Sequence, residues 1–346
     1  MERAAVWQIS QPVSLRLFVI ASGTYSGVFL KVKVNNRSVL SVIQQYHAGN
    51  IELCLFLLRY RLWSCSVRIH MQQAMTPQSI ILDGDTFLTF RASSWDERAF
   101  NMPVREILSL SFQDKNGAGA LLESFDRHCR NEQVGLAFIR LQSQDKERIA
   151  LIQNHGFRFV ESTLLLRLKH LSHWQPLVKR PTRLTLHDAV ADDMPAIRAL
   201  AHDHIHHGRF HEDPYMDHCH SRLRFSRWMD DHFMGEQPLW VTRRGNKILA
   251  FLAISISYPH AKLLLGASLP DARPLATIFM WQSALGRLRD MELKTVQAMV
   301  STANLLSLNL HLKLGFQCME SLVGLHRHYF QESLNIRSFS PSDQST

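Results

Sequence analysis

Residues 261–278 read AKLLLGASLPDARPLATI, and this stretch decides the fold. The apolar run at residues 263–265 predicts a buried strand, and residues 277–290 then carry apolar side chains at helical spacing. Backbone N–H groups converge where a strand passes into the start of a helix, so such a junction tends to hold an anionic ligand. The stretch therefore predicts a strand, an anion-binding turn and a helix.

A second junction of the same kind lies downstream. Residues 294–299 predict a strand, and residues 304–315 carry leucines at helical spacing that end at Gly315, a typical helix C-terminal glycine. Asn304 stands directly after the predicted strand. It is either a helix N-cap, which Asn forms well, or a residue that holds a ligand, and both roles can hold at once.

An internal repeat supports two related units. Residues 156–162 read GFRFVES and residues 315–321 read GFQCMES, an offset of 315 − 156 = 159 residues. Each copy follows a predicted strand and short helix and precedes another strand. We interpret the repeat as two α/β units, the first truncated and the second complete. A chance match of two helix-ending glycines is the alternative.

These motifs resemble the GNAT family of N-acyltransferases, which bind acetyl-CoA. The family has a glycine-rich turn and a later Asn followed by a Tyr; here both turn glycines are absent, and His311 stands where the Tyr is usual. The resemblance implies that His311 protonates the departing thiolate, with packing on a helix face as the alternative. The resemblance also implies an acetyl-CoA site formed by Ala267, Leu269, Arg273, Pro274, Leu275, Ala276, Thr277, Ile278 and Asn304. The alternative is a loop-to-helix turn that binds no ligand.

Two further segments resemble sugar-nucleotide acetyltransferases of the dTDP-fucosamine group. They are residues 95–104, WDERAFNMPV, and residues 209–214, RFHEDP. This resemblance implies a nucleotide-linked amino sugar as acceptor, bound by Arg209, Phe210, His211 and Asp213. A structural turn is the alternative for the second segment. The strands predicted to flank the cofactor, residues 248–256 and 262–269, contain no carboxylate, so no general base is expected from them.

The predicted fold class is α/β with α+β character: a GNAT fold whose mixed central sheet is flanked by helices, preceded by a truncated GNAT-like unit. Residues 76–170 form the truncated unit, 171–182 a linker, and 183–330 the C-terminal acetyltransferase domain. Residues 331–346 are expected to be a disordered tail. Residues 1–75 match no family pattern. They are either a small extra module or an upstream extension, with the start of the native protein near Met71 or Met75.

Composition narrows the function classes. The chain has 346 residues and a net charge of +9, which suits anionic ligands, but no basic block with interleaved aromatic residues favours nucleic acid. The five cysteines are scattered and form no Cys-x-x-Cys pair, which is typical of a reducing cytoplasm. No apolar stretch reaches the roughly 18 residues of a spanning helix.

Seven histidines crowd residues 202–220, and pairs at i, i+4 could bind zinc, but no Cys or carboxylate completes a known ligand spacing. We therefore expect no metal. The predicted function is acetyl-CoA-dependent N-acetylation of a primary amine on a small acceptor. A catalytically inactive GNAT scaffold that binds a ligand or partner is the alternative. A homodimer is left open.

Overall fold

The computed structural model describes residues 77–177, 183–272 and 274–329, together with the backbone of three earlier strands. The chain divides into two compact units, Met1–Met71 and Gln72–Thr346. In the first, β1 (Leu15–Ser22), β2 (Tyr25–Val34) and β3 (Arg37–Val42) pair as an antiparallel sheet. The rest of the predicted extension and the predicted tail lie outside the described residues.

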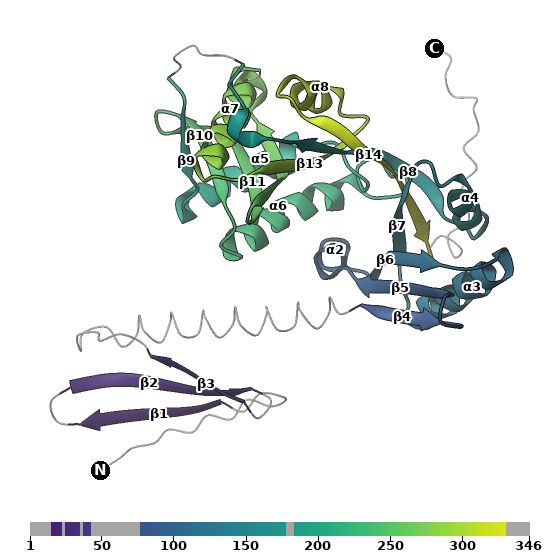
Figure 1. The fold of residues 1–346 in the computed structure, drawn as a ribbon. Helices are drawn as coiled ribbons and strands as arrows, with labels where there is room; N and C mark the ends of the chain where they lie inside the picture. The colour runs from purple at the N-terminus through teal and green to yellow at the C-terminus, as the bar shows by residue number, and fades with distance from the viewer. Residues whose placement is uncertain are drawn as a thin grey trace. The chain divides into compact units, whose positions relative to one another are not determined.

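The second unit contains every other element (Figure 1). Its strands are β4 (Gln78–Ile81), β5 (Phe87–Ala92), β6 (Val104–Ser111), β7 (Leu136–Gln142), β8 (Arg158–Leu168), β9 (Thr185–Asp188), β10 (Leu239–Arg244), β11 (Lys247–Ser257), β12 (His260–Ser268), β13 (Thr295–Ser301) and β14 (Gln317–His328). Its α-helices are α2 (Ser94–Phe100), α3 (Lys115–Asn131), α4 (Lys146–Asn154), α5 (Met194–His204), α6 (His218–Met234), α7 (Leu275–Asp290) and α8 (Leu305–Lys313). Three 3-10 turns connect them: η1 (Leu171–His173), η2 (Ala191–Asp193) and η3 (Pro270–Ala272).

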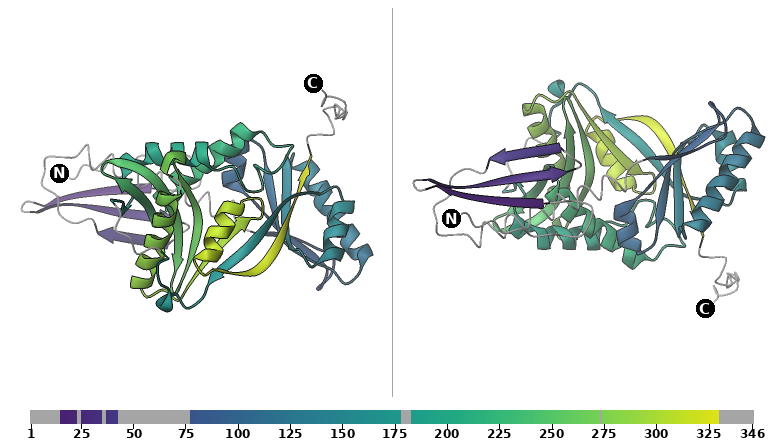
Figure 2. Two further views of the ribbon diagram at one scale, coloured as in Figure 1. Left: turned by 90° about the horizontal axis from the view of Figure 1, so that it is seen from above. Right: turned by 90° about the horizontal axis from the view of Figure 1, so that it is seen from below.

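The strands of this unit form one sheet in which the two halves exchange their last strands. The order is β4-β5-β6-β7-β14-β8-β13-β12-β11-β10-β9. The last strand of the second half, β14, pairs with β7 of the first, and β8 of the first half pairs with β13 of the second. Figure 2 shows the yellow β14 running from the second half into the blue first half. The result is a mixed, mostly antiparallel sheet flanked by helices, as the sequence predicted.

The repeat found in the sequence is a repeat of structure. The starts of β7, α4 and β8 lie 159 residues before those of β13, α8 and β14 (295 − 136, 305 − 146 and 317 − 158). Gly156 and Gly315 both follow the short helix with positive φ angles of 81° and 93°, a backbone conformation that glycine adopts without strain. Phe157 and Phe316, the next residues, are both buried. The two halves are therefore built on the same plan.

Helices cover both faces of the sheet. In the second half α7 packs on one face, where Trp240, Leu252 and Ile254 point, and α5 and α6 pack on the other, where Val241 and Phe251 point. In the first half α3 and α4 share one core with β5–β7. On the opposite face α2 is joined by residues of the loop between α5 and α6. That loop connects the two halves and lies close to the candidate site.

No helix of the described residues is both long and apolar enough to cross a membrane.

Candidate active site

The neighbouring parallel strands β12 and β13 separate along their length. They pair from His260 with Thr295 to Leu263 with Ala298, and the pairing ends there although both strands continue. At this point the register between β11 and β12 shifts by one residue, because Ala253 pairs with Leu265 and Ile254 with Leu263. Such a bulge bends the strand and increases its twist. The ends of β12 and β13 therefore do not pair with each other beyond Leu263 and Ala298.

The first half repeats this geometry. Strands β6 and β7 pair from Val104 with Leu136 to Ile107 with Ile139 and then separate. The pairing of β5 with β6 shifts register at the corresponding place, since Thr89 pairs with Ser109 and Phe90 with Ile107. Each half thus contains a bulged strand, a separating parallel partner and a helix between them.

The predicted cofactor turn connects β12 with α7. Leu269 N donates to Leu249 O at 2.8 Å, and Ala267 lies in the core. Pro274 is the N-cap residue of α7, and Leu275, the first helical residue, is 47% exposed. Ala267 lies in β12, and Leu269, Pro274 and Leu275 follow that strand, whereas Arg273 lies outside the described residues.

The next three predicted cofactor residues open α7. Ala276 is buried, and the Thr277 hydroxyl lies 2.6 Å from that of Ser268. Ile278 N donates to Pro274 O at 3.0 Å. The start of α7 is thus held against the end of β12, with Leu275 on its outer side.

The N-terminal ends of α3 and α7 occupy equivalent places but differ in charge. Asp114 caps α3, and its carboxylate accepts from Gly117 N at 2.8 Å. Pro274 makes no side-chain hydrogen bond to the first turn of α7. The first amides of any helix lack partners within the helix and attract anions. The Asp114 carboxylate satisfies one of these amides in α3, that of Gly117, whereas Pro274, the N-cap residue of α7, has no side-chain acceptor to offer.

His311 lies in the core and joins two helices. It is 3% exposed; its Nε2 accepts from Trp281 Nε1 at 3.1 Å, and its Nδ1 lies 2.7 Å from Ser307 O. These contacts fit the neutral tautomer that carries its proton on Nδ1. Burial lowers the pKa of His311, which the hydrogen bond to Ser307 opposes. Both ring nitrogens are therefore engaged in the protein interior.

Trp281 in turn packs against β12 just beyond the bulge. A methyl group built on Gly266 would approach Cη2 of Trp281 to 2.6 Å and Phe251 O to 3.1 Å. Only glycine lets the indole lie this close to the strand. A series of packing contacts through His311, Trp281 and Gly266 thus connects α8, α7 and β12.

Asn304 is the N-cap of α8, and its Oδ1 accepts from Ser307 N at 3.1 Å. Asp145 plays the same part 159 residues earlier (304 − 145), accepting from Arg148 N at 3.1 Å in α4. The capping role of Asn304 is confirmed, and its contact with a cofactor stays a prediction.

The loop between α5 and α6 carries the predicted acceptor residues. Arg209 lies over Phe138, with its guanidinium carbon 3.8 Å from the ring centroid, and donates to Asp96 at 3.3 Å. Phe210 is buried against Phe100 and Phe138. Burial lowers the pKa of Arg209 to about 10 despite the opposing charge of Asp96. Arg209 and Phe210 therefore contact the first half.

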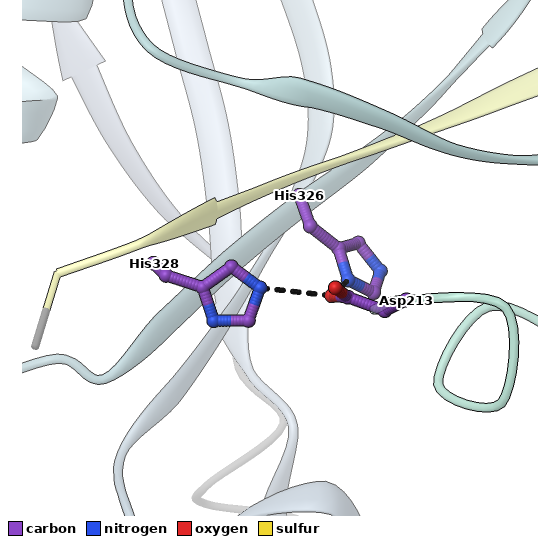
Figure 3. A group of neighbouring side chains, drawn as sticks. All are labelled: Asp213, His326 and His328. Atoms are coloured by element: carbon purple, nitrogen blue, oxygen red, sulfur yellow. Dashed lines mark hydrogen bonds and ion pairs between the residues drawn. The ribbon is translucent and has the colours of Figure 1, made fainter. Parts of the chain in front are cut away.

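The side chains of His211 and Asp213 lie in different environments. The His211 ring stacks on Phe225 at 5.2 Å between centroids, and burial lowers its pKa to about 4. Asp213 is fully buried and accepts from Tyr215 N at 2.9 Å through Oδ1. Its other oxygen lies 2.6 Å from Nδ1 of His326 and 2.8 Å from Nε2 of His328 (Figure 3). The histidine-rich segment therefore supplies Asp213 to a cluster whose histidines lie on β14.

Glu212, which also belongs to the RFHEDP segment, reaches the end of β13. Its Oε1 accepts from the Ser301 hydroxyl at 2.6 Å and from Gly208 N at 3.0 Å. Ser301 is the last residue of β13, beyond the point where β12 and β13 separate. No carboxylate was expected from the flanking strands, and this one comes from a loop 89 residues away. Sequence spacing gives no signal for such a contact.

Neither a family model nor a curated protein matches the sequence. Solved structures do match. A GCN5-related N-acetyltransferase from Sphaerobacter thermophilus gives a TM-score of 0.53 at 11% identity over 72% of this chain and 82% of its own. A functionally unknown conserved protein from Staphylococcus epidermidis gives 0.54 at 8% identity over 73% and 95%. Identities this low show the fold alone, which is the GNAT fold.

A third similar structure is the GCN5-related glucosamine N-acetyltransferase region of a fungal multi-domain β-N-acetylglucosaminidase. Its TM-score is 0.55 at 12% identity, over 75% of this chain and 34% of that one. This chain therefore corresponds to about a third of the fungal protein.

Proposed function

We propose that the second half of the chain is an acetyl-CoA-dependent N-acetyltransferase acting on a primary amine of a small acceptor. The observation that carries the proposal is the difference between the two halves. Both have the bulged strand and the separating parallel pair, but the N-cap residue of α3 is an aspartate and that of α7 is Pro274, which carries no charge. A diphosphate would be repelled by Asp114 at the start of α3 and attracted at the start of α7.

The residues that would hold the donor are those of the turn and the strand ends. The first amides of α7 and the Arg273 side chain would bind the phosphates, and the backbone of β12 beyond Leu263, where its pairing with β13 has ended, would orient the acyl arm. Exposed Leu275 and Met299 offer apolar surface near these elements, 47% and 45% exposed respectively. Acetyl-CoA supplies the activated acetyl group.

We propose Glu212 as the group that accepts a proton from the acceptor amine. An amine attacks a carbonyl only in its neutral form, so a nearby base assists the transfer. Glu212 is half-buried and is held at the end of β13 by Ser301 and Gly208 N. Its Oε2 makes no hydrogen bond among those of the described residues, so one carboxylate oxygen is available to a ligand.

For His311 we propose a positioning role in place of the predicted proton donation. A general acid needs an N–H that faces the reacting atom, and the Nδ1 of His311 faces Ser307 O at 2.7 Å. The contact with Trp281 instead fixes the helix that begins at the turn.

An amino sugar is the acceptor we propose to test first. The RFHEDP segment resembles sugar-nucleotide acetyltransferases, and a structure with a similar fold is a glucosamine N-acetyltransferase region. Arg209, Phe210 and His211 would shape the acceptor side through the loop that also carries Glu212.

The test is release of free thiol from acetyl-CoA in the presence of glucosamine, a dTDP-linked amino sugar and a simple alkylamine. We expect an amine-dependent signal that Glu212→Gln lowers by about 10²–10⁴-fold, the usual contribution of a general base. Glu123→Gln, on the exposed side of α3, removes the same charge and should leave the rate unchanged. Folded protein that binds CoA and transfers acetyl to none of these amines would point instead to a ligand-binding scaffold.

A further inference from the structure

We infer that Asp213, His326 and His328 form a binding site for a divalent transition-metal ion such as zinc. His326 and His328 are two residues apart on β14, so both side chains point to the same face of the strand. Asp213 comes from the loop between α5 and α6 and lies between them (Figure 3). One ligand atom from each residue lies within 4.8 Å of the other two.

The ligand chemistry selects the class of ion. Two imidazole nitrogens and one carboxylate oxygen suit zinc and its first-row neighbours, whereas calcium and magnesium prefer oxygen ligands throughout. Three protein ligands leave a position for water or another molecule, as in open zinc sites. Asp213 is fully buried and the His326 side chain is 1% exposed, while that of His328 is 11% exposed. The ion would thus enter on the side of His328.

The present contacts are close to those that a metal would make. The carboxylate oxygen lies 2.6 and 2.8 Å from the two nitrogens, whereas ligands of a tetrahedral zinc ion are about 3.3 Å apart. The two oxygen–nitrogen distances would widen by about 0.5–0.7 Å, and the two nitrogens, which lie within 4.8 Å of each other, would settle at about the same 3.3 Å separation. Each neutral imidazole keeps one proton, which moves from the ligating nitrogen to the other ring nitrogen.

The second nitrogen of His326 supports the assignment. His326 Nε2 is buried and has no hydrogen-bond partner among the described residues, and the same is true of Glu161 Oε2. Glu161 lies across Gly324, two residues before His326 on the same face of β14, because a methyl group on Gly324 would approach its Cγ to 2.6 Å. A metal on Nδ1 would make Nε2 a donor on the face of β14 where Glu161 Oε2 is an acceptor without a partner among the described residues; the two atoms form no hydrogen bond in the metal-free structure. Metal-bound histidines commonly donate their other N–H to a carboxylate in this way.

Local charge is compatible with a cation. The positive charge nearest in effect to His326 is the guanidinium of Arg209, which disfavours the protonated imidazole. This guanidinium is paired with the buried carboxylate of Asp96 at 3.3 Å, which offsets its charge. The Asp213 carboxylate has no cationic partner other than the two imidazoles among the described residues. A bound ion would supply the missing charge and fasten the loop to the strand that the two halves share.

The experiment is a titration of the full chain, first stripped with a chelator, with ZnCl2 and separately with CoCl2. We expect one ion per chain at this site, a melting temperature that rises with the logarithm of zinc concentration, and the visible absorption of cobalt bound to nitrogen ligands. His328→Ala should weaken zinc binding by about tenfold or more. His220→Ala should not, although His220 also pairs with a carboxylate, Asp217 at 2.7 Å on the surface.

The zinc affinities of the two histidine variants decide whether the site is correctly assigned. Equal zinc affinity in His328→Ala and the wild type, or a loss confined to His220→Ala, would overturn the assignment. If His328→Ala does not fold, the cobalt spectrum of the wild type decides. A spectrum of ordinary hydrated cobalt would then exclude the site.

Discussion

Replacing His311 by phenylalanine should destabilise the protein without removing a catalytic group. Phenylalanine fills most of the space of the imidazole but cannot accept from Trp281 Nε1, which is buried beside it. A buried donor left without a partner costs about 1–3 kcal/mol. For a unit of this size a loss of about 2 kcal/mol lowers Tm by roughly 4–8 °C. His311→Gln offers an oxygen to the indole and should recover part of the loss.

The assay is urea unfolding followed by far-ultraviolet circular dichroism, which does not depend on the tryptophan that loses its partner. Phenylalanine and glutamine variants that are both as stable as the wild type would refute the packed link between α8 and α7. Variants that bind CoA normally and both lose turnover completely, at unchanged stability, would show that His311 takes part in the chemistry.

The same variant tests the effect of acid. Burial lowers the pKa of His311, whereas in the unfolded chain it titrates near the ordinary value of 6.5. The unfolded state therefore binds a proton that the folded state does not, once the pH is below about 6.5. Stability that depends on neutral His311 is complete above that pH and is lost as the pH falls from 6.5 toward the lowered pKa. The stability of His311→Phe should decline less steeply between pH 6.5 and 5 than that of the wild type.

Two further substitutions test the packing around the site. Gly266→Ala forces a methyl group against Trp281 and should lower the free energy of unfolding, measured in urea, by about 1–3 kcal/mol. The control Gly286→Ala has no atom within 4 Å of the added methyl and should leave the stability unchanged or raise it. Equal effects of the two substitutions would contradict the close contact. Asp96→Asn removes a fully buried carboxylate that Arg224 contacts, and should cost about 3–5 kcal/mol because the guanidinium loses its charge partner. A loss below 1 kcal/mol in thermal unfolding would show that this pair contributes little to joining the halves.

The elements of the second unit follow from local patterns, which is why the sequence predicts them. The predicted strand at residues 263–265 lies in β12, His260–Ser268, and the strand predicted at residues 294–299 is β13, Thr295–Ser301. Boundaries are less accurate, because the apolar stripe does not mark the first helical residue. The helix predicted at residues 277–290 begins at Leu275, directly after its N-cap Pro274.

The exchange of last strands and the contacts of the site could not be predicted in this way. No local pattern indicates that β14 lies between β7 and β8, since each strand would pair equally well within its own half. Asp213 and His326 are 113 residues apart, and the strand exchange brings the shared strand to the loop. The role of His311 likewise depends on Trp281, 30 residues away.

The most direct test is calorimetric titration of CoA into the wild type and two variants that each add one negative charge at a helix start. Leu275→Asp places it on α7, and Asn116→Asp places it on the exposed first turn of α3. We predict that one CoA binds per chain, that Leu275→Asp abolishes this binding, and that Asn116→Asp leaves the affinity unchanged. No binding by the wild type, two molecules per chain, or equal affinity in all three proteins would contradict it.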